Sequence, residues 1–138
     1  MRYVIDTNVL VTGLRSNQGT AFQFLSSLGS FSHQLIVSTP LVLEYEDVLN
    51  RPGLVAGISQ NDIADFIDYL ISISEECRIH FLGRPFLPDP KDDMVLELAL
   101  AGGADYIVTY NKKDFTGIEQ FGLQTVTPGE FLNLIASL

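Results

Sequence analysis

Hydrophobic residues recur along the chain with two alternating spacings. Short runs rich in β-branched residues predict buried strands at residues 3–5, 35–37, near 78–81, 106–109 and 124–126. Apolar positions three or four residues apart predict helices over 7–14, 19–28, 40–50, 60–73, 92–101 and from Pro128 onward. Strands separated by helices favour a mostly parallel sheet covered on both faces. The expected fold class is therefore α/β, a three-layer α/β/α sandwich.

Length and composition predict one cytoplasmic domain over residues 1–138. The chain is 46% hydrophobic, which is enough to form a single core. Its most apolar stretch, residues 94–101, is far shorter than the roughly 20 residues that span a bilayer. Asp6 interrupts the N-terminal hydrophobic run, unlike a secretory signal. The single Cys77 cannot form an intrachain disulfide.

Net charge argues against a protein that holds nucleic acid by bulk electrostatics. Seventeen acidic residues stand against eight basic ones, which gives a formal charge of −9. A polyanionic partner would therefore need a local source of positive charge.

Acidic residues occur at four places, either after the predicted strands, where functional groups of parallel sheets gather, or on an adjoining helix. Asp6 ends the first strand, and Asp114 lies five residues after Thr109. Glu44 lies in the first turns of the helix after the second strand, and its position nearer the strand end favours it over Glu46. A cluster at the start of a later helix contains Asp89, Asp92 and Asp93.

Helical geometry selects one residue from this cluster. Each residue advances roughly 100° around the helix axis, so Asp92 lies in the middle of the arc occupied by Val95, Leu96 and Ala99. Asp93 is expected to point to one side. Asp92 therefore faces the core, where a carboxylate needs a cation or hydrogen-bond donors. Thr39 is the expected cap of the helix over residues 40–50, with Pro40 at the first helical position.

The four acids together favour a hard divalent cation. Each acid alone has an ordinary role as a helix cap or turn residue, but like charges at one end of a sheet repel unless something positive lies between them. Mg²⁺ and Mn²⁺ prefer carboxylate and water oxygens, and no Cys or His spacing suits zinc. His33 and His80 are isolated and are expected on the surface or in the core.

Four segments resemble the signature segments of PIN-domain ribonucleases, over about residues 2–131. They are Val4-Ile5-Asp6-Thr7-Asn8-Val9-Leu10, Ser38-Thr39-Pro40-Leu41-Val42-Leu43-Glu44-Tyr45, Asp89-Pro90-Lys91-Asp92-Asp93 and Thr109-Tyr110-Asn111-Lys112-Lys113-Asp114-Phe115. Within that family the chain most resembles VapC-like toxins of type II toxin–antitoxin modules.

This resemblance implies a metal-dependent endoribonuclease with RNA as its substrate, a cognate antitoxin as partner and a homodimeric state. The implied holders of Mg²⁺ or Mn²⁺ are Asp6, Glu44, Asp92 and Asp114. The implied polar supports are Thr7, Asn8, Thr109 and Asn111. Some relatives have Asp where this chain has Asn111, so the resemblance leaves open whether one metal ion or two bind.

Phosphodiester hydrolysis requires an activated water and stabilisation of negative charge, both of which a divalent cation supplies. Asp6 is the expected central ligand, Asp92 and Asp114 complete the site, and Glu44 ligates the metal or orients the water. Contacts to phosphate are expected from Arg15, Lys112 and Lys113.

Three other interpretations fit the sequence less well. A receiver-like signalling domain also has an acidic Mg²⁺ pocket, but it needs a Lys after its fifth strand that this chain does not supply. A haloacid-dehalogenase-like phosphohydrolase needs Asp where the chain has Asn8. A non-catalytic PIN-like interaction module is expected to lack acids that are present here.

Overall fold

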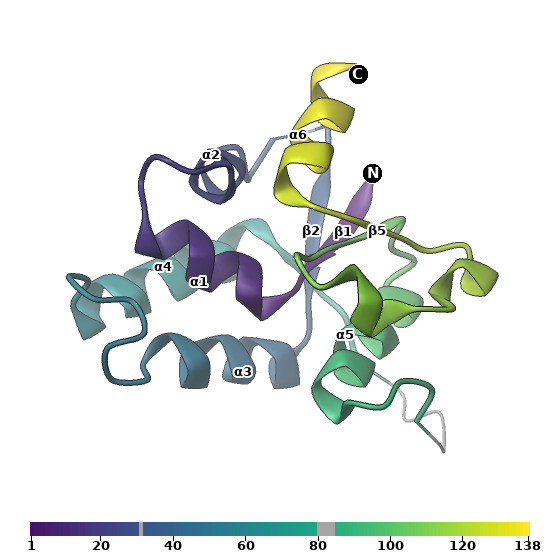
Figure 1. The fold of residues 1–138 in the computed structure, drawn as a ribbon, viewed down its shortest axis with the longest axis horizontal. Helices are drawn as coiled ribbons and strands as arrows, with labels where there is room; N and C mark the ends of the chain where they lie inside the picture. Colours follow the sequence, from purple (N-terminus) through teal and green to yellow (C-terminus); the bar gives the residue numbers. More distant parts are fainter. Residues whose placement is uncertain (31, 80–84) are drawn as a thin grey trace.

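The computed structural model describes residues 1–30, 32–79 and 85–138 (Figure 1). Its strands are β1 (Arg2–Ile5), β2 (Gln34–Val37), β3 (Glu75–Glu76), β4 (Tyr106–Val108) and β5 (Gln124–Val126). Its α-helices are α1 (Thr7–Arg15), α2 (Thr20–Ser26), α3 (Thr39–Leu49), α4 (Gln60–Ile73), α5 (Pro90–Ala101) and α6 (Pro128–Ala136). Two short 3-10 helices, η1 (Lys112–Phe115) and η2 (Ile118–Phe121), follow β4. None of the helices in these residues is both long and apolar enough to cross a membrane.

The strands form a parallel sheet in the order β3-β2-β1-β4-β5, which confirms the predicted α/β class. Two central strands, β1 and β4, pair in register with Ile5 opposite Val108. Receiver domains have the order 2-1-3-4-5, in which β3 rather than β4 lies beside β1. The observed order therefore excludes the receiver-like alternative.

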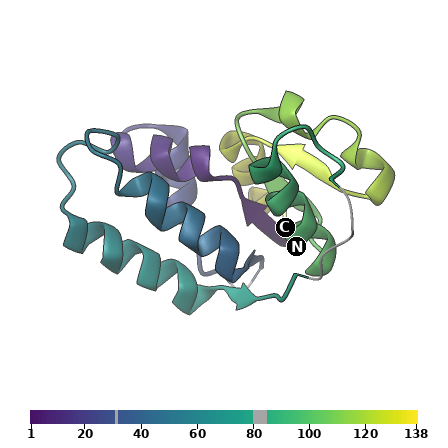
Figure 2. The same cartoon turned by 90° about the horizontal axis from the view of Figure 1, so that it is seen from below.

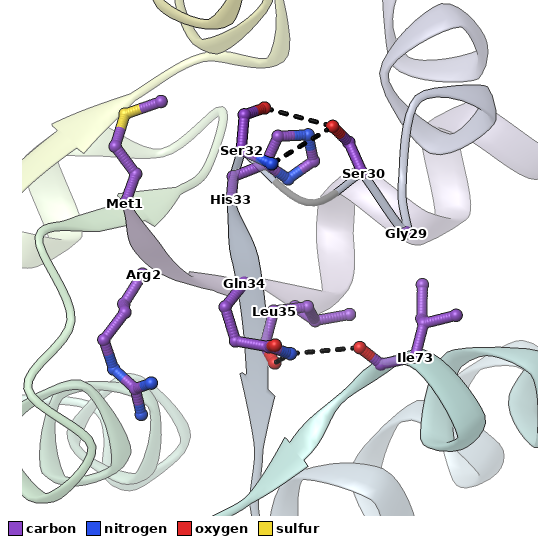
Figure 3. Close-up of a pocket in the computed structure, with 9 residues that line it drawn as sticks. All are labelled: Met1, Arg2, Gly29, Ser30, Ser32, His33, Gln34, Leu35 and Ile73. Atoms are coloured by element: carbon purple, nitrogen blue, oxygen red, sulfur yellow. Dashed lines mark hydrogen bonds between the residues drawn. The ribbon is translucent and has the colours of Figure 1, made fainter.

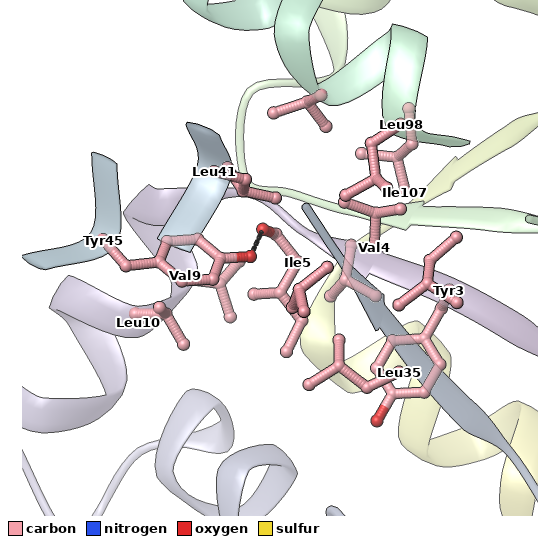
Figure 4. Close-up of a cluster of buried hydrophobic side chains, with 14 of the residues drawn as sticks. Tyr3, Val4, Ile5, Val9, Leu10, Leu35, Leu41, Tyr45, Leu98 and Ile107 are labelled. Atoms are coloured by element: carbon pink, nitrogen blue, oxygen red, sulfur yellow. Dashed lines mark hydrogen bonds between the residues drawn. The ribbon is translucent and has the colours of Figure 1, made fainter. Parts of the chain in front are cut away.

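Alternating side chains of β1 pack against helices on opposite faces of the sheet. Val4 lies with Ile107 and Leu98 of α5 on one face (Figure 4). The Tyr3 ring lies on the other face, 6.1 Å from Phe24 of α2 and 4.6 Å from Phe131 of α6. Helices on both faces give the predicted three layers. α3 and α4 lie side by side beyond the sheet (Figure 2).

His33 belongs to the aromatic face of the core. Its ring lies 5.4 Å from Tyr3 and 5.5 Å from Phe131, and the residue is 5% exposed. Neither ring nitrogen has a hydrogen-bond partner within the described ranges. Burial, together with the nearby N-terminal amino group, lowers the pKa of His33. His33 therefore lies in the core, one of its two expected locations, but without the hydrogen bonds expected there, whereas His80 lies outside the described residues.

Two local predictions are wrong. Ser38 rather than Thr39 caps α3, because the Ser38 hydroxyl accepts a hydrogen bond from the Leu41 amide while Thr39 donates to Glu76. The strand expected near residues 78–81 lies instead at β3, where Glu75 and Glu76 pair with Ile36 and Val37. Residues 78 and 79 are irregular, and residues 80 and 81 lie outside the described residues. β3 is an exposed edge strand, so backbone pairing rather than side-chain burial defines it.

Candidate functional site

Asp6, Glu44, Asp92 and Asp114 line one pocket of about 190 Å³ beside the carboxyl ends of β1 and β4. These acids come from four segments that are far apart in the sequence. The other lining residues are Thr7, Asn8, Leu41, Asp89, Lys91, Met94, Val95 and Asn111. The parallel sheet and its flanking helices therefore bring together all four acids that the sequence singles out.

Asp6 is held by hydrogen bonds to the end of β4 and to the start of α1. Its backbone amide donates to the Val108 carbonyl at 2.9 Å, which continues the β1–β4 pairing. Its carboxylate oxygen Oδ2 accepts hydrogen bonds from the Thr109 hydroxyl at 2.8 Å and from the Asn8 side-chain amide at 3.2 Å. Tyr45 of α3 donates its hydroxyl hydrogen to the Ile5 carbonyl just before Asp6. These bonds fix the carboxylate at the end of β1.

The expected polar supports lie around Asp6. Thr7 is buried at the start of α1, and Asn8 and Asn111 line the pocket. The Asn111 amide donates to the Thr109 hydroxyl oxygen at 3.0 Å, so Thr109 links Asp6 to the segment that leads to Asp114. The structure thus gives Thr109 and Asn8 direct contacts with the Asp6 carboxylate.

Glu44 forms a contact that the sequence analysis does not identify. Lys91 Nζ lies 3.5 Å from Glu44 Oε1, and the Glu44 side chain is only 16% exposed. Lys91 is thus a positive charge inside the acidic pocket. The signal available in the sequence is its place between Asp89 and Asp92 in one of the resemblance segments.

The burial of Asp93 differs from the prediction, in which only Asp92 faces the interior. Asp92 is half-buried and lines the pocket, but Asp93 is the more buried residue, at 7% exposure. The Asp93 carboxylate accepts hydrogen bonds from the amides of Phe86 and Leu87. The segment before α5 folds back over the start of the helix and covers this second side. α5 also begins earlier than predicted, with Asp89 as its cap.

None of the three predicted phosphate-binding residues lines the acidic pocket itself. Arg15 lies at the far end of α1, roughly 12 Å along the helix axis from Thr7. Lys112 forms an ion pair with Glu130 of α6 at 2.6 Å. Lys113 is exposed and lies next to Asp114 on η1. Of the three bases, only Lys112 and Lys113 lie beside the acids.

Burial and then crowding raise the pKa values of two of the acids. Burial raises the pKa of Asp6 above its usual range, although the Thr109 hydroxyl bond opposes that rise. Burial and then the negative charge of Asp6, followed by Asp114, Asp89 and Asp93, raise the pKa of Asp92 to about 6. Without a cation, Asp6 and Asp92 therefore resist ionisation.

The donor chemistry of the pocket fits a hard divalent cation. The lining residues offer carboxylate, amide and hydroxyl oxygens and no thiolate or imidazole. Within the described ranges, no three His, Cys, Asp or Glu side chains lie close enough together to hold an ion as placed. The acids share one pocket, and their side chains would have to converge further to ligate a metal.

Asp92→Asn is expected to stabilise the metal-free protein. The raised pKa means that the folded state retains a proton that the unfolded chain loses, so stability falls as pH rises from about 4 to 6. Asparagine removes this loss, which after solvent screening is worth about 1 kcal/mol at pH 7, or a few degrees in melting temperature. Thermal unfolding in EDTA at pH 4 and pH 7 measures it. An equal melting temperature for both proteins at pH 7 would contradict the expectation.

A larger pocket of about 410 Å³ lies at the opposite end of the sheet (Figure 3). Two of its polar side chains are engaged in other contacts, because Gln34 donates to the Ile73 carbonyl and Arg2 pairs with Glu75 at 2.8 Å. The His33 ring also lines this pocket, without a hydrogen-bond partner among the described residues. No carboxylate is among the described residues that line it. The smaller acidic pocket is therefore the better candidate for the functional site.

A family model for the PIN domain matches residues 2–113 of the chain. The chain belongs to the PIN domain family. This membership confirms the resemblance to PIN domains that the sequence analysis describes. It also supports a nuclease activity, which is a hydrolase reaction. PIN-domain nucleases generally use divalent metals.

The fold of this PIN domain is similar to two solved structures. One is VapBC2 from Rickettsia felis bound to a DNA fragment from their promoter, with a TM-score of 0.64, 18% identity, and coverage of 91% of this chain and 99% of that chain. The other is VapBC-1 from nontypeable Haemophilus influenzae, with a TM-score of 0.63, 18% identity, and coverage of 93% and 98%. A search of curated proteins finds no match.

Proposed function

We propose that this PIN domain is a metal-dependent endoribonuclease that hydrolyses RNA phosphodiester bonds. The main support is the convergence of Asp6, Glu44, Asp92 and Asp114 on one pocket. Burial, followed by the charges of Asp6 and Asp114, raises the pKa of Asp92, and keeping such a cluster is costly for a purely structural role. Family membership supports the same reaction class.

In the proposed site, Asp6, Asp92, Asp114 and Glu44 hold Mg²⁺ or Mn²⁺. A bound ion would supply an activated water and would offset the negative charge that develops at phosphorus. Thr109 and Asn8 orient the Asp6 carboxylate through their hydrogen bonds. Glu44 would ligate the ion or orient the attacking water. Lys91 moderates the charge of Glu44 before a metal binds.

RNA binding by an acidic protein depends on local charge. The formal net charge of −9 opposes approach of a polyanion, whereas Lys91 and Lys113 lie in or beside the pocket. Bound divalent ions cancel further negative charge there. We therefore expect modest affinity that weakens as salt concentration rises.

The proposal extends to the toxin component of a toxin–antitoxin pair. Support comes from the two similar structures, which are both named as VapBC assemblies. Together with the toxin role, we propose an antitoxin partner, a homodimeric state and a cytoplasmic location.

Cleavage of a panel of labelled RNAs and one single-stranded DNA tests the function. The purified protein is incubated with Mg²⁺, Mn²⁺ or EDTA, and binding of each ion is followed by calorimetry. We expect RNA cleavage with either metal and none in EDTA. Metal binding without cleavage of any RNA would rule out the proposed substrate class. The absence of both would favour a non-catalytic interaction module.

A further inference from the structure

A second hollow, of about 590 Å³, adjoins the acidic pocket. It is lined by Tyr110, Asn111, Lys112, Lys113, Asp114 and Thr127. Asn111 and Asp114 line both cavities. A ligand that reaches the acids from this side therefore passes over the segment between β4 and η1.

Tyr110 is the aromatic side chain of this hollow. It is 41% exposed although it directly follows Thr109, which is fully buried. Phe86 and Phe121 are similarly exposed, but their rings pack against each other with centroids 5.1 Å apart. Tyr110 has no such ring partner within the described ranges. Its ring is thus available to a ligand.

The backbone of Tyr110 is tied to the residues that hold Asp6. The Tyr110 amide donates to Asn8 Oδ1 at 3.4 Å, and Asn8 also donates to the Asp6 carboxylate. On either side, Thr109 donates to Asp6 and the Asn111 amide donates to Thr109. A group bound on Tyr110 is therefore held at a defined position relative to Asp6.

The two lysines of the hollow have different surroundings. Lys112 is ion-paired with Glu130, which also accepts a hydrogen bond from the Thr127 amide. Lys113 is exposed and has no ion pair within the described ranges. Lys113 is consequently the cation of the hollow that is available to a phosphate.

We propose that Tyr110 stacks on the base of a nucleotide that flanks the cleaved phosphodiester, with Lys113 contacting the backbone phosphate. An exposed aromatic ring beside a cation is the combination that binds single-stranded nucleic acid, because every base presents a π-face. A base can stack on Tyr110 only when it is unpaired, so the protein is expected to prefer RNA that is unpaired at the cleavage position. This inference rests on the proposed ribonuclease function.

Variants of Tyr110 test the stacking contact. We expect Tyr110→Ala to lower kcat/KM for a labelled single-stranded RNA by about 10- to 100-fold, mostly through KM. Tyr110→Phe keeps the ring and is expected to retain nearly full activity. Tyr69→Ala, which changes a tyrosine of similar exposure on α4, is the matched control and leaves cleavage unchanged. Circular dichroism checks that each variant is folded.

RNAs with one abasic nucleotide beside the mapped cleavage position provide the second measurement. Stacking predicts that one abasic position slows the wild-type protein about as much as Tyr110→Ala does, with no further loss when the two are combined. The stacking role would be overturned if Tyr110→Ala cleaved RNA at the wild-type rate, or if its loss of activity added to the loss from an abasic nucleotide at every position. Either result would leave the proposed ribonuclease function standing. If the wild-type protein cleaves no RNA with metal, the proposed function fails and the stacking role fails with it.

Discussion

We expect Asp6→Asn to reduce RNA cleavage by more than about 100-fold while leaving the protein folded. Asparagine is isosteric and keeps a side-chain oxygen that can accept the hydrogen bonds from Thr109 and Asn8. What it removes is the negative charge at the centre of the acidic pocket, on which cation binding depends. Loss of that charge also relieves repulsion with Asp92, so the fold has no electrostatic reason to weaken.

The control for this variant is Asp68→Asn on α4. It makes the same change of charge on an exposed helix face outside the acidic pocket. Cleavage rates and calorimetric metal binding are compared for both variants and the wild-type protein. Near wild-type cleavage by Asp6→Asn would show that Asp6 is not part of the reaction centre.

We expect Asp93→Ala to destabilise the fold by about 2–4 kcal/mol. Asp93 is 7% exposed, and its carboxylate accepts hydrogen bonds from the Phe86 amide at 3.1 and 3.2 Å and from the Leu87 amide at 2.8 Å. Alanine leaves both amides without this acceptor and frees the segment that leads into α5. Urea unfolding monitored by circular dichroism measures the loss.

The adjacent aspartate makes this prediction sharper. Asp92→Asn is expected to stabilise the metal-free protein, whereas Asp93→Asn is expected to destabilise it less than Asp93→Ala does. The amide oxygen of the introduced asparagine could still accept one backbone bond, but its NH₂ group would face a second donor. Equal stability of the wild-type protein and Asp93→Ala would mean that the carboxylate does not anchor residues 86 and 87.

The α/β class and the location of the acids follow from the amino-acid sequence alone. Apolar runs such as Val4-Ile5 and Ile107-Val108 are hydrophobic enough to be buried on both faces of a parallel sheet, and most helices begin within a few residues of the predicted positions. Asp6 and Asp114 follow parallel strands, whose carboxyl ends share one edge of the sheet. Glu44 and Asp92 lie near the starts of helices that connect parallel strands, and such helices begin at the same edge. This geometry lets the sequence pattern group the four acids, which line one pocket in the fold.

Which groups touch depends on the tertiary structure. The Lys91–Glu44 pair joins two helices, and no periodicity within either helix specifies it. Asp93 is buried because a segment outside its own helix covers it, which a one-sided helical pattern cannot show. β3 exists because the backbone of β2 offers it hydrogen-bond partners, although its own side chains are exposed glutamates. The Lys91–Glu44 pair and the β2–β3 pairing join segments distant in sequence, and the Asp93 contacts join the helix to the loop just before it. A local hydrophobic pattern shows only which side of a segment faces the core, so it predicts none of these contacts.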